Sequence, residues 1–340
     1  MSSRVVVVGA GLIGTYVGAA LHAAGAQVTL IGRARMRGQV ASAPLLVTDL
    51  DGGRTEIAAG TLDYREDPAA LADAGLVLVT VKCADTASAA ELVGRYVPHD
   101  GPVVLSLQNG VGNADVLTAA LPGSTVIAGL VPFNVTSPEP GRLHRATEGG
   151  LMTAQSPALE PWLDAFAAAG LPIGQHRDFL AVQWGKLLFN LNNAVNALAG
   201  IPLRAELSQR AYRRAYALLV AEALSVLKAA GVPVAGVSKV PPKALPVLLK
   251  VPDAVFTRLA GAMLRIDPEA RSSMWEDLAA GRRTEVDYLN GAVVALAGRV
   301  GVAAPVNQAV VDLVHAAETA PRTPLTGADL FARLAAAREV

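Results

Sequence analysis

Short apolar runs alternate with segments of helical spacing through the first half of the chain. The runs occupy residues 5–8, 27–31, 76–81, 103–107 and 125–128, and the first consists of four valines. Runs of this length, dominated by β-branched and aliphatic side chains, are typical of parallel strands that are buried on both faces. Strands that alternate with helices predict an α/β N-terminal domain of the Rossmann type, built on a parallel sheet.

Additional strands interrupt this alternation. Residues 45–48 and 55–58 flank the turn Asp51-Gly52-Gly53 and predict an inserted hairpin. Residues 141–145 and 150–154 have the short alternating pattern of antiparallel strands, and we expect them at the edge of the parallel sheet.

Past Asp178 the strand pattern disappears and helical spacing replaces it. We therefore expect a Rossmann-type domain over 1–177 and an all-α domain over 178–340. Prolines, among them Pro241, Pro242, Pro246 and Pro252, divide residues 232–252 into short broken turns, which we expect at the surface. The expected helices of the second domain cover 179–196, 205–230, 253–264, 285–300 and 305–320.

A glycine-rich turn joins the first strand to the first helix. Gly9 permits the tight turn, Gly11 lets the backbone approach a pyrophosphate, and Gly14 lets the helix pack closely on the strand. Leu12 and Ile13 lie in the first turn of the helix, where backbone N–H groups and the helix dipole favour an anion. The turn therefore predicts a dinucleotide site.

Arg33 indicates which dinucleotide binds. A cofactor with a free ribose 2′-hydroxyl usually meets a carboxylate at the end of the second strand, but Gly32 and Arg33 stand there instead. A guanidinium suits a 2′-phosphate because it forms bidentate, charge-assisted hydrogen bonds. A solvated basic loop is the alternative. The residues favour NADP(H) over NAD(H).

Two further polar positions follow strands. Lys82 comes after the run 76–81, and Asn109 after the run 103–107. Ligands of open parallel sheets lie beyond the carboxyl ends of the strands, so both side chains are expected at the dinucleotide site. A surface lysine and an ordinary Asn-Gly turn are the alternatives. Cys83, which is the only cysteine, is interpreted as a small core residue.

Charge and composition exclude several classes of protein. Lysine plus arginine and aspartate plus glutamate number 29 each, which gives no electrostatic basis for binding nucleic acid or an anionic membrane. The uncharged stretch 5–32 resembles a signal peptide or membrane span, but its glycines and a second strand contradict this interpretation. The five histidines lack metal-ligand spacing, so we expect no metal. One cysteine suits a reducing cytoplasm.

The second half carries polar residues on an apolar helix. Lys186, Asn190 and Asn193 fall on one stripe of the expected helix 179–196. Buried without partners they would be costly, so they either satisfy one another in a core or face a cleft, which we favour. Thr284 has the character of a helix cap, and Glu285 next to it could be no more than a partner of the helix dipole.

These motifs together resemble the ketopantoate reductase family, the 2-dehydropantoate 2-reductases, over nearly the whole chain. The resemblance rests on Gly9-Ala-Gly-Leu-Ile-Gly14, Val81-Lys82, Gln108-Asn109-Gly110, Trp184-x-Lys186-Leu-x-x-Asn190, Ser272-Ser273-Met274 and the block 282–291. It implies NADPH-dependent reduction of a 2-oxo acid to a 2-hydroxy acid, most specifically ketopantoate to pantoate in pantothenate and coenzyme A biosynthesis. A Rossmann domain would bind NADP and a helical domain would supply the substrate and catalytic residues.

The resemblance also implies roles for individual residues. Lys186 matches the general acid, and Glu285 matches the carboxylate that organises the lysine and the substrate. Asn190 and Ser273 match residues that hold the substrate, while Lys82 and Asn109 match the junction of cofactor and substrate. In the family a further asparagine falls where this chain has Ala194, with Asn193 and Asn196 beside it.

Two other functions remain open at this point. The chain could reduce a different 2-oxo acid or a ketone, since it departs from the family at Ala194 and is longer through residues 232–252. A non-catalytic NADP(H) sensor is the second alternative, although a sensor has no use for the proton donor Lys186. The apolar helical half makes a homodimer plausible.

Overall fold

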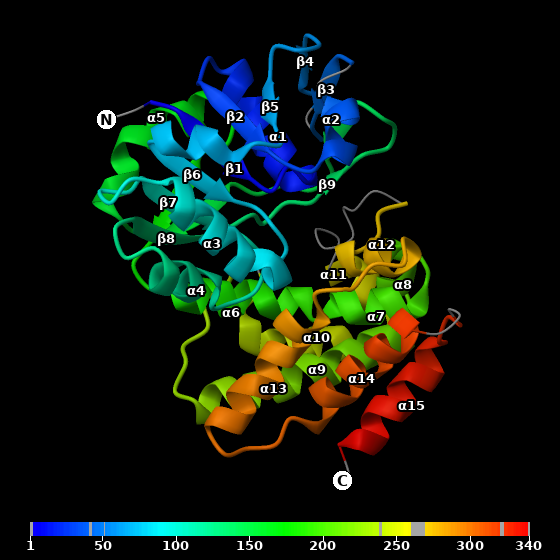
Figure 1. Ribbon diagram of the computed structural model, residues 1–340. Coiled ribbons are helices and arrows are strands. Elements are labelled where there is room, and N and C mark those ends of the chain that lie inside the picture. The colour runs from blue at the N-terminus through cyan, green and yellow to red at the C-terminus, as the bar shows by residue number, and fades with distance from the viewer. Residues whose placement is uncertain are drawn as a thin grey trace. The chain divides into compact units, whose positions relative to one another are not determined.

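The computed structural model describes residues 3–40, 43–50, 52–237, 240–259, 269–319 and 323–338. The chain divides into two compact units, Met1–Phe179 and Leu180–Val340, called unit 1 and unit 2. Unit 1 is an α/β structure and unit 2 is helical (Figure 1). In the part of the chain that the structure describes, no helix combines the length and the apolar character that a membrane crossing needs.

Unit 1 contains a sheet of eight strands. These are β1 (Val5–Val8), β2 (Val28–Ile31), β5 (Asp63–Arg65), β6 (Leu76–Val79), β7 (Val103–Leu107), β8 (Thr125–Leu130), β11 (Leu151–Ala154) and β12 (Ile173–His176). Their order is β12-β11-β8-β7-β6-β1-β2-β5. The six strands from β5 to β8 are parallel, and β11 adds to β8 in the antiparallel direction. The mostly parallel sheet confirms the prediction of a Rossmann-type domain.

The valines of β1 explain why this strand lies in the middle of the sheet. Val5 and Val7 belong to one apolar core, and Val6 and Val8 belong to another. The first core includes side chains of α1 (Leu12–Ala23) and α5 (Glu160–Ala168). The second includes side chains of α3 (Thr86–Tyr96) and α4 (Asn113–Ala120). Helices therefore cover both faces of the sheet, as the unbroken valine run predicts.

A second sheet of four strands stands beside the first and has the order β4-β3-β10-β9. Its strands are β3 (Leu45–Thr48), β4 (Arg54–Ile57), β9 (Val135–Thr136) and β10 (Arg142–Arg145). β3 and β4 form the predicted antiparallel hairpin, although Asp51 of its turn lies outside the described residues. The prediction for 141–145 was wrong: β10 pairs with β3 and β9 rather than with the larger sheet. β11 does join the larger sheet in the antiparallel direction, but β12 pairs with its outer side, so β12 rather than β11 is the edge strand.

Unit 2 is built around α9 (Arg210–Ala229), which packs against most of the other helices. Those helices are α6 (Phe179–Asn190), α7 (Asn192–Ala199), α8 (Leu203–Leu207), α10 (Leu245–Lys250), α11 (Asp253–Leu259), α12 (Ser273–Ala279), α13 (Asn290–Arg299), α14 (Pro305–Thr319) and α15 (Gly327–Ala337). In Figure 1 they run from green α6 to red α15. The sequence did not predict α15. The remaining helices, α2 (Ala34–Val40) of unit 1 and the short 3₁₀ turns, complete the chain.

Two expected helices are each divided in two. The helix expected over 179–196 ends at Asn190 and resumes at Asn192, and that expected over 205–230 is interrupted between α8 and α9. Asparagine and serine side chains offer the backbone local hydrogen bonds that compete with a helix, which apolar spacing does not reveal. Part of the helix expected over 253–264 lies outside the described residues.

The proline-rich segment is more buried than expected. Its described residues form the 3₁₀ turn Pro242–Ala244 and the helix α10, while residues 238 and 239 lie outside the described part. Leu245 and Leu249 of α10 are fully buried against α9, so the prediction of surface turns was wrong for this helix. Proline at the start of α10 is compatible with a helix because the first turn needs no amide donor.

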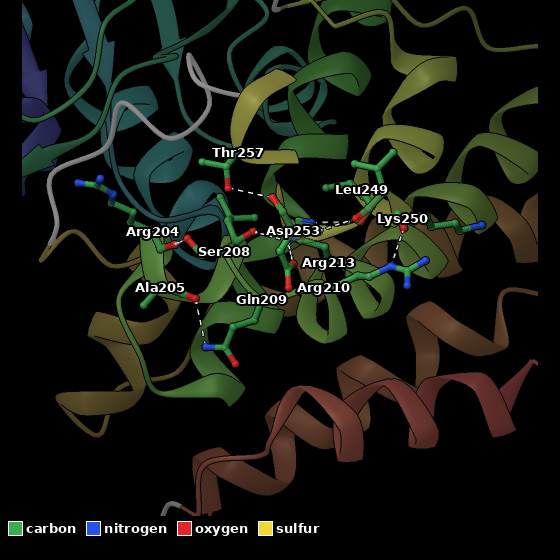
Figure 2. Close-up of polar contacts among 12 residues, drawn as sticks. Arg204, Ala205, Ser208, Gln209, Arg210, Arg213, Leu249, Lys250, Asp253 and Thr257 are labelled. Atoms are coloured by element: carbon green, nitrogen blue, oxygen red, sulfur yellow. Dashed lines mark hydrogen bonds and ion pairs between the residues drawn. The ribbon is translucent and has the colours of Figure 1, made fainter. Parts of the chain in front are cut away.

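Arg213 of α9 holds the proline-rich segment in place through hydrogen bonds. Its guanidinium donates to the carbonyl oxygens of Leu207 at 2.9 Å and Val251 at 2.7 Å, and to Oδ1 of Asp253 at 2.8 Å (Figure 2). It also stacks 4.1 Å from the ring centroid of Phe256. Arg213 is fully buried, and these contacts join the end of α8, the end of α10 and the start of α11.

Candidate active site

The glycine-rich turn of unit 1 is as tight as the sequence suggests. Gly9 has φ +105°, and a Cβ there would lie 2.8 Å from the backbone nitrogen of Val81. At Gly14 a Cβ would lie 2.3 Å from the Gly9 oxygen and 2.4 Å from Oγ1 of Thr80, which itself donates to Gly9 O at 2.7 Å. A Cβ on Gly11 would meet no atom of the described residues within 4 Å, so this side of the turn is open.

The N-terminus of α1 faces this opening with backbone groups alone. Gly11 is the N-cap and provides no side-chain cap, and the first turn contains no acidic residue. The first amides of a helix, here those of Leu12 and Ile13, have no partner inside the helix. Amide donors without a nearby carboxylate suit the phosphates of a dinucleotide.

Arg33 follows the carboxyl end of β2. Its side chain is 87% exposed, and Nη2 lies 3.7 Å from Oδ2 of Asp85. An exposed ion pair this long contributes less than about 1 kcal/mol, so it does not hold the guanidinium against a better anion. The backbone next to it is fixed, because the Tyr64 hydroxyl donates to Arg33 O at 2.8 Å.

Lys82 and Asn109 lie in the loops after β6 and β7. The expected run 76–81 places Lys82 directly at the end of a strand. In the structure β6 ends at Val79, so Lys82 lies three residues beyond it. Both residues are half-buried. β6 and β7 are adjacent parallel strands, which brings the two loops to the same edge of the sheet.

A buried polar network connects these loops, and sequence reasoning missed it. Gln108 Nε2 donates to Thr86 Oγ1 at 2.8 Å, and the Thr86 hydroxyl donates to Asn113 Oδ1 at 2.9 Å. Asn113 Nδ2 and Cys83 Sγ then donate to Asn109 O at 2.7 and 3.1 Å. Cys83 is buried, as its interpretation as a core residue predicts. The network fixes the backbone of Asn109.

In unit 2, α6 carries Lys186 and Asn190 one turn apart. Lys186 is half-buried, and the loss of water around its ammonium lowers its pKa to about 8. Asn190 is buried at the last position of the helix. A lysine of this pKa exchanges its proton near neutrality, which a solvated lysine does not.

The start of α12 lies against α7. Ser272 is the N-cap of α12: its Oγ accepts from Trp275 N at 3.1 Å and donates to Asn193 O at 3.2 Å. Its backbone N–H donates to Oδ1 of Asn196 at 2.9 Å. Asn196 is fully buried, whereas Asn193 and Ser273 are half-buried. The fold therefore brings Asn193 and Ser273 close together from segments far apart in sequence.

Glu285 precedes a 3₁₀ turn, Val286–Tyr288, rather than the helix that the sequence predicts from 285. The Thr284 hydroxyl accepts from Val286 N at 3.3 Å, but the N-cap of this turn is Glu285 rather than Thr284, and α13 begins only at Asn290. Glu285 is half-buried, and the turn packs against α13 and α14. The carboxylate thus comes from a third segment of unit 2.

Glu206 of α8 is a polar residue that the sequence gives no reason to single out. It is fully buried, and its Oε2 accepts hydrogen bonds from Asn192 Nδ2 at 3.0 Å and Asn196 Nδ2 at 3.3 Å. Burial raises the pKa of Glu206 to about 8 although the two amide hydrogen bonds lower it. For metals, no group of histidine, cysteine or acidic side chains in the described residues is arranged to hold an ion.

Comparison with known proteins assigns a class and a family. A model described as "Ketopantoate reductase PanE/ApbA" matches residues 5–157, and one described as "Ketopantoate reductase PanE/ApbA C terminal" matches residues 178–318. A 2-dehydropantoate 2-reductase of Halobacterium salinarum is 34% identical over 93% of this chain and 99% of its own length. The class is therefore a pyridine-nucleotide-dependent oxidoreductase that acts on CH–OH groups. The chain belongs to the ketopantoate reductase family.

Solved structures share this fold. The crystal structure of a PanE/ApbA family ketopantoate reductase from Ralstonia eutropha matches with a TM-score of 0.78 and 28% identity, covering 93% of this chain and 98% of that chain. The ternary structure of D-mandelate dehydrogenase with NADH and anilino(oxo)acetate matches with a TM-score of 0.74 and 21% identity over the same shares. The similarity to D-mandelate dehydrogenase shows a shared fold only.

Proposed function

We propose that this protein reduces 2-dehydropantoate (ketopantoate) to pantoate with NADPH. The observation that carries the chemical part of the proposal is on α6, where the ammonium of Lys186 has a pKa of about 8 and Asn190 follows one turn later. Reduction of a carbonyl leaves negative charge on its oxygen, which requires a proton donor at that atom. Lys186 supplies that proton.

Residues 1–177 form the NADP-binding domain in this proposal. Gly9, Gly11 and Gly14, with the amides of Leu12 and Ile13, receive the pyrophosphate, and the open side of Gly11 supports this fit. Arg33 binds the 2′-phosphate just past the end of β2, where the sequence has Gly32 and Arg33 in place of the usual carboxylate. Bound NADPH supplies the hydride.

Residues 178–340 form the domain that holds the substrate. Asn190, Asn193 and Ser273 donate hydrogen bonds to the oxo acid, and their positions on α6, α7 and α12 support this role. Asn196 is fully buried and bonded to Ser272, so Asn193 is the better replacement for the family asparagine at position 194. Glu285 accepts from the lysine ammonium or from a substrate hydroxyl.

Lys82 and Asn109 act where cofactor and substrate meet. Their loops follow β6 and β7, next to β1 at the centre of the sheet, which is where doubly wound folds bind dinucleotides. The network from Gln108 to Asn109 supports a fixed position for the Asn109 backbone. A positioned amide and ammonium orient the carbonyl for transfer.

A different 2-oxo acid is the second candidate substrate, and Ala194 favours it. Position 194 carries a methyl group where the family pattern has an amide, so this chain lacks one polar group that the family pattern provides for its substrate. The structural neighbour D-mandelate dehydrogenase, which shares the fold, was solved with anilino(oxo)acetate, and this supports testing aromatic oxo acids.

NADPH oxidation, followed with ketopantoate and with a panel of simpler and aromatic 2-oxo acids, tests both candidates. The expected result is the highest kcat/KM with ketopantoate and NADPH. A higher value with another oxo acid would replace the substrate, and absence of turnover with every oxo acid would favour the NADP(H) sensor. A homodimer stays a prediction, which analytical ultracentrifugation of the purified protein would test.

A further inference from the structure

Glu206 is a buried carboxyl group that forms no ion pair with any described residue. It lies on α8 with no exposed surface, and the described residues offer its carboxyl group only two hydrogen-bond donors, the amides of Asn192 and Asn196. Both amides donate to Oε2. An ionised carboxylate in such surroundings lacks the compensation that buried charges normally have.

Two buried oxygen atoms, Oε1 of Glu206 and Oδ1 of Asn192, have no hydrogen-bond partner in the part of the chain that the structure describes. They belong to the same two side chains that already share the bond from Asn192 Nδ2 to Oε2 at 3.0 Å. Buried polar atoms are nearly always paired, so two unpaired acceptors on one hydrogen-bonded pair of side chains call for a donor, which a proton on the carboxyl group would supply.

We propose that Glu206 is a neutral carboxylic acid whose Oε1 hydroxyl donates to Asn192 Oδ1, and that this acid–amide pair is a positioning element for the oxo-acid site. One proton satisfies both orphaned oxygens and removes the buried charge. The positioning role rests on the proposed function. The protonation of Glu206 does not.

Asn196 carries the effect from Glu206 to the start of α12. Its Nδ2 donates to Glu206 Oε2 at 3.3 Å and to Ile201 O at 2.9 Å, which leaves Oδ1 directed at Ser272 N at 2.9 Å. Ser272 in turn donates to Asn193 O at 3.2 Å. The proposed substrate residues Asn193 and Ser273 are therefore set by a chain that begins at Glu206.

The neighbouring titratable groups leave the proton on Glu206. Tyr212 and Tyr216 of α9 donate their hydroxyls to Leu325 O and Leu188 O at 2.9 and 3.0 Å, and burial raises the pKa of both. Two arginines of the surrounding segments bind elsewhere. Arg213 pairs with Asp253, and Arg271 donates to Gly200 O and stacks on Trp275.

Infrared difference spectroscopy of the full chain tests the protonation. At pH 7 the wild type minus E206Q spectrum is expected to show the C=O stretch of a protonated carboxylic acid. E222Q is the matched control, because Glu222 accepts three N–H hydrogen bonds, from Val306 and Asn307, and has no orphaned oxygen. Its difference spectrum should lack that band. A carboxylate band in place of the acid band for Glu206 overturns the proposal.

Thermal unfolding gives a second readout that needs no substrate. Glu206 keeps its proton to about pH 8 in the folded state, compared with 4.5 for an ordinary glutamate. Between these values the folded state binds the extra proton, so wild-type stability must fall relative to E206Q as the pH rises. Equal pH slopes for the two proteins contradict a neutral Glu206.

Kinetics test the positioning role. Gln can form the same pair through its amide group, so E206Q should keep its KM for ketopantoate within about twofold of wild type. E206L should raise this KM roughly tenfold, because it leaves the side-chain amides of Asn192 and Asn196 without their acceptor. The KM for NADPH should not change in either variant. Lys186 also titrates near pH 8 in both proteins, so the readout is the difference between them: above pH 8 the KM for ketopantoate should rise more in wild type than in E206Q. Should E206L fail to fold, the pH profiles of wild type and E206Q decide. Equal rises in both overturn the role.

Discussion

Gly185 lies directly against the backbone carbonyl of Ala235. A Cβ on Gly185 would be 2.0 Å from that oxygen, and the Ala235 amide donates to Ala181 O at 2.9 Å. The segment after α9 therefore packs directly against α6 at Gly185, the residue that precedes Lys186. Only a residue without a side chain permits this approach.

Gly185→Ala should lower the free energy of unfolding by about 1–3 kcal/mol, because the added methyl group forces the two backbones apart. Gly298→Ala is the control: Gly298 is an exposed residue of α13 with nothing within 4 Å of its Cβ position. That substitution should stabilise the helix by up to about 1 kcal/mol. Urea denaturation of both variants measures the difference, and an unchanged midpoint for Gly185→Ala would contradict the close approach.

Arg33→Ala should raise the KM for NADPH and leave that for NADH nearly unchanged. The expected loss is about 1.5–3 kcal/mol, typical of a hydrogen bond between charged groups. Arg95→Ala removes another exposed arginine of unit 1, paired with Glu91 on α3, and should change neither constant. A wild type that uses both nucleotides equally, or an Arg33→Ala variant that loses both, would disprove the assignment to the 2′-phosphate.

Lys186→Ala should lower kcat by roughly 10²–10⁴ if the lysine is the general acid. Wild-type kcat should also fall as the pH rises through about 8, because only the ammonium form donates a proton and its pKa is lowered to that value by burial. NADPH binding, followed by cofactor fluorescence, should be largely retained. Near-normal turnover of the variant would make Lys186 a structural residue.

Glu285→Ala should cost more kcat/KM with ketopantoate than with its analogue that lacks the 4-hydroxyl. An acceptor built for a substrate hydroxyl is left unpaired by the analogue, so wild type should already discriminate strongly between the two. Asp287→Ala is the neighbouring control, since Asp287 is exposed and lies 3.1 Å from Nε2 of His315. Equal losses on both substrates would mean that Glu285 serves only Lys186.

Arg213→Met should destabilise the protein by roughly 2–5 kcal/mol, because it leaves several buried carbonyl groups without donors. Arg210→Met is the control, since Arg210 makes one exposed hydrogen bond, to Lys250 O at 2.8 Å (Figure 2). It should cost less than about 0.5 kcal/mol. Similar melting temperatures for the two variants would refute the fastening role of Arg213.

The sequence by itself determined the features that depend on neighbouring residues. The valines of residues 5–8, the turn from Gly9 to Gly14 and the buried strand 103–107 predicted the centre of the sheet, because strand burial and tight turns are encoded within a few positions. The block 282–291, with Lys186 and Asn190, was sufficient to indicate the family that the comparisons establish.

Only the tertiary structure decided which distant segments pair. Strand 142–145 joined the second sheet rather than the first. The sequence could not decide this, because its partner β3 lies about a hundred residues earlier and an edge strand of either sheet could form its backbone hydrogen bonds. Glu206 has the local pattern of a surface glutamate on a helix. Its burial against Asn192 and Asn196 arises from the packing of α7 and α8. Hydrogen-bond partners and desolvation are properties of the folded neighbourhood, which the spacing of residues along a chain does not contain.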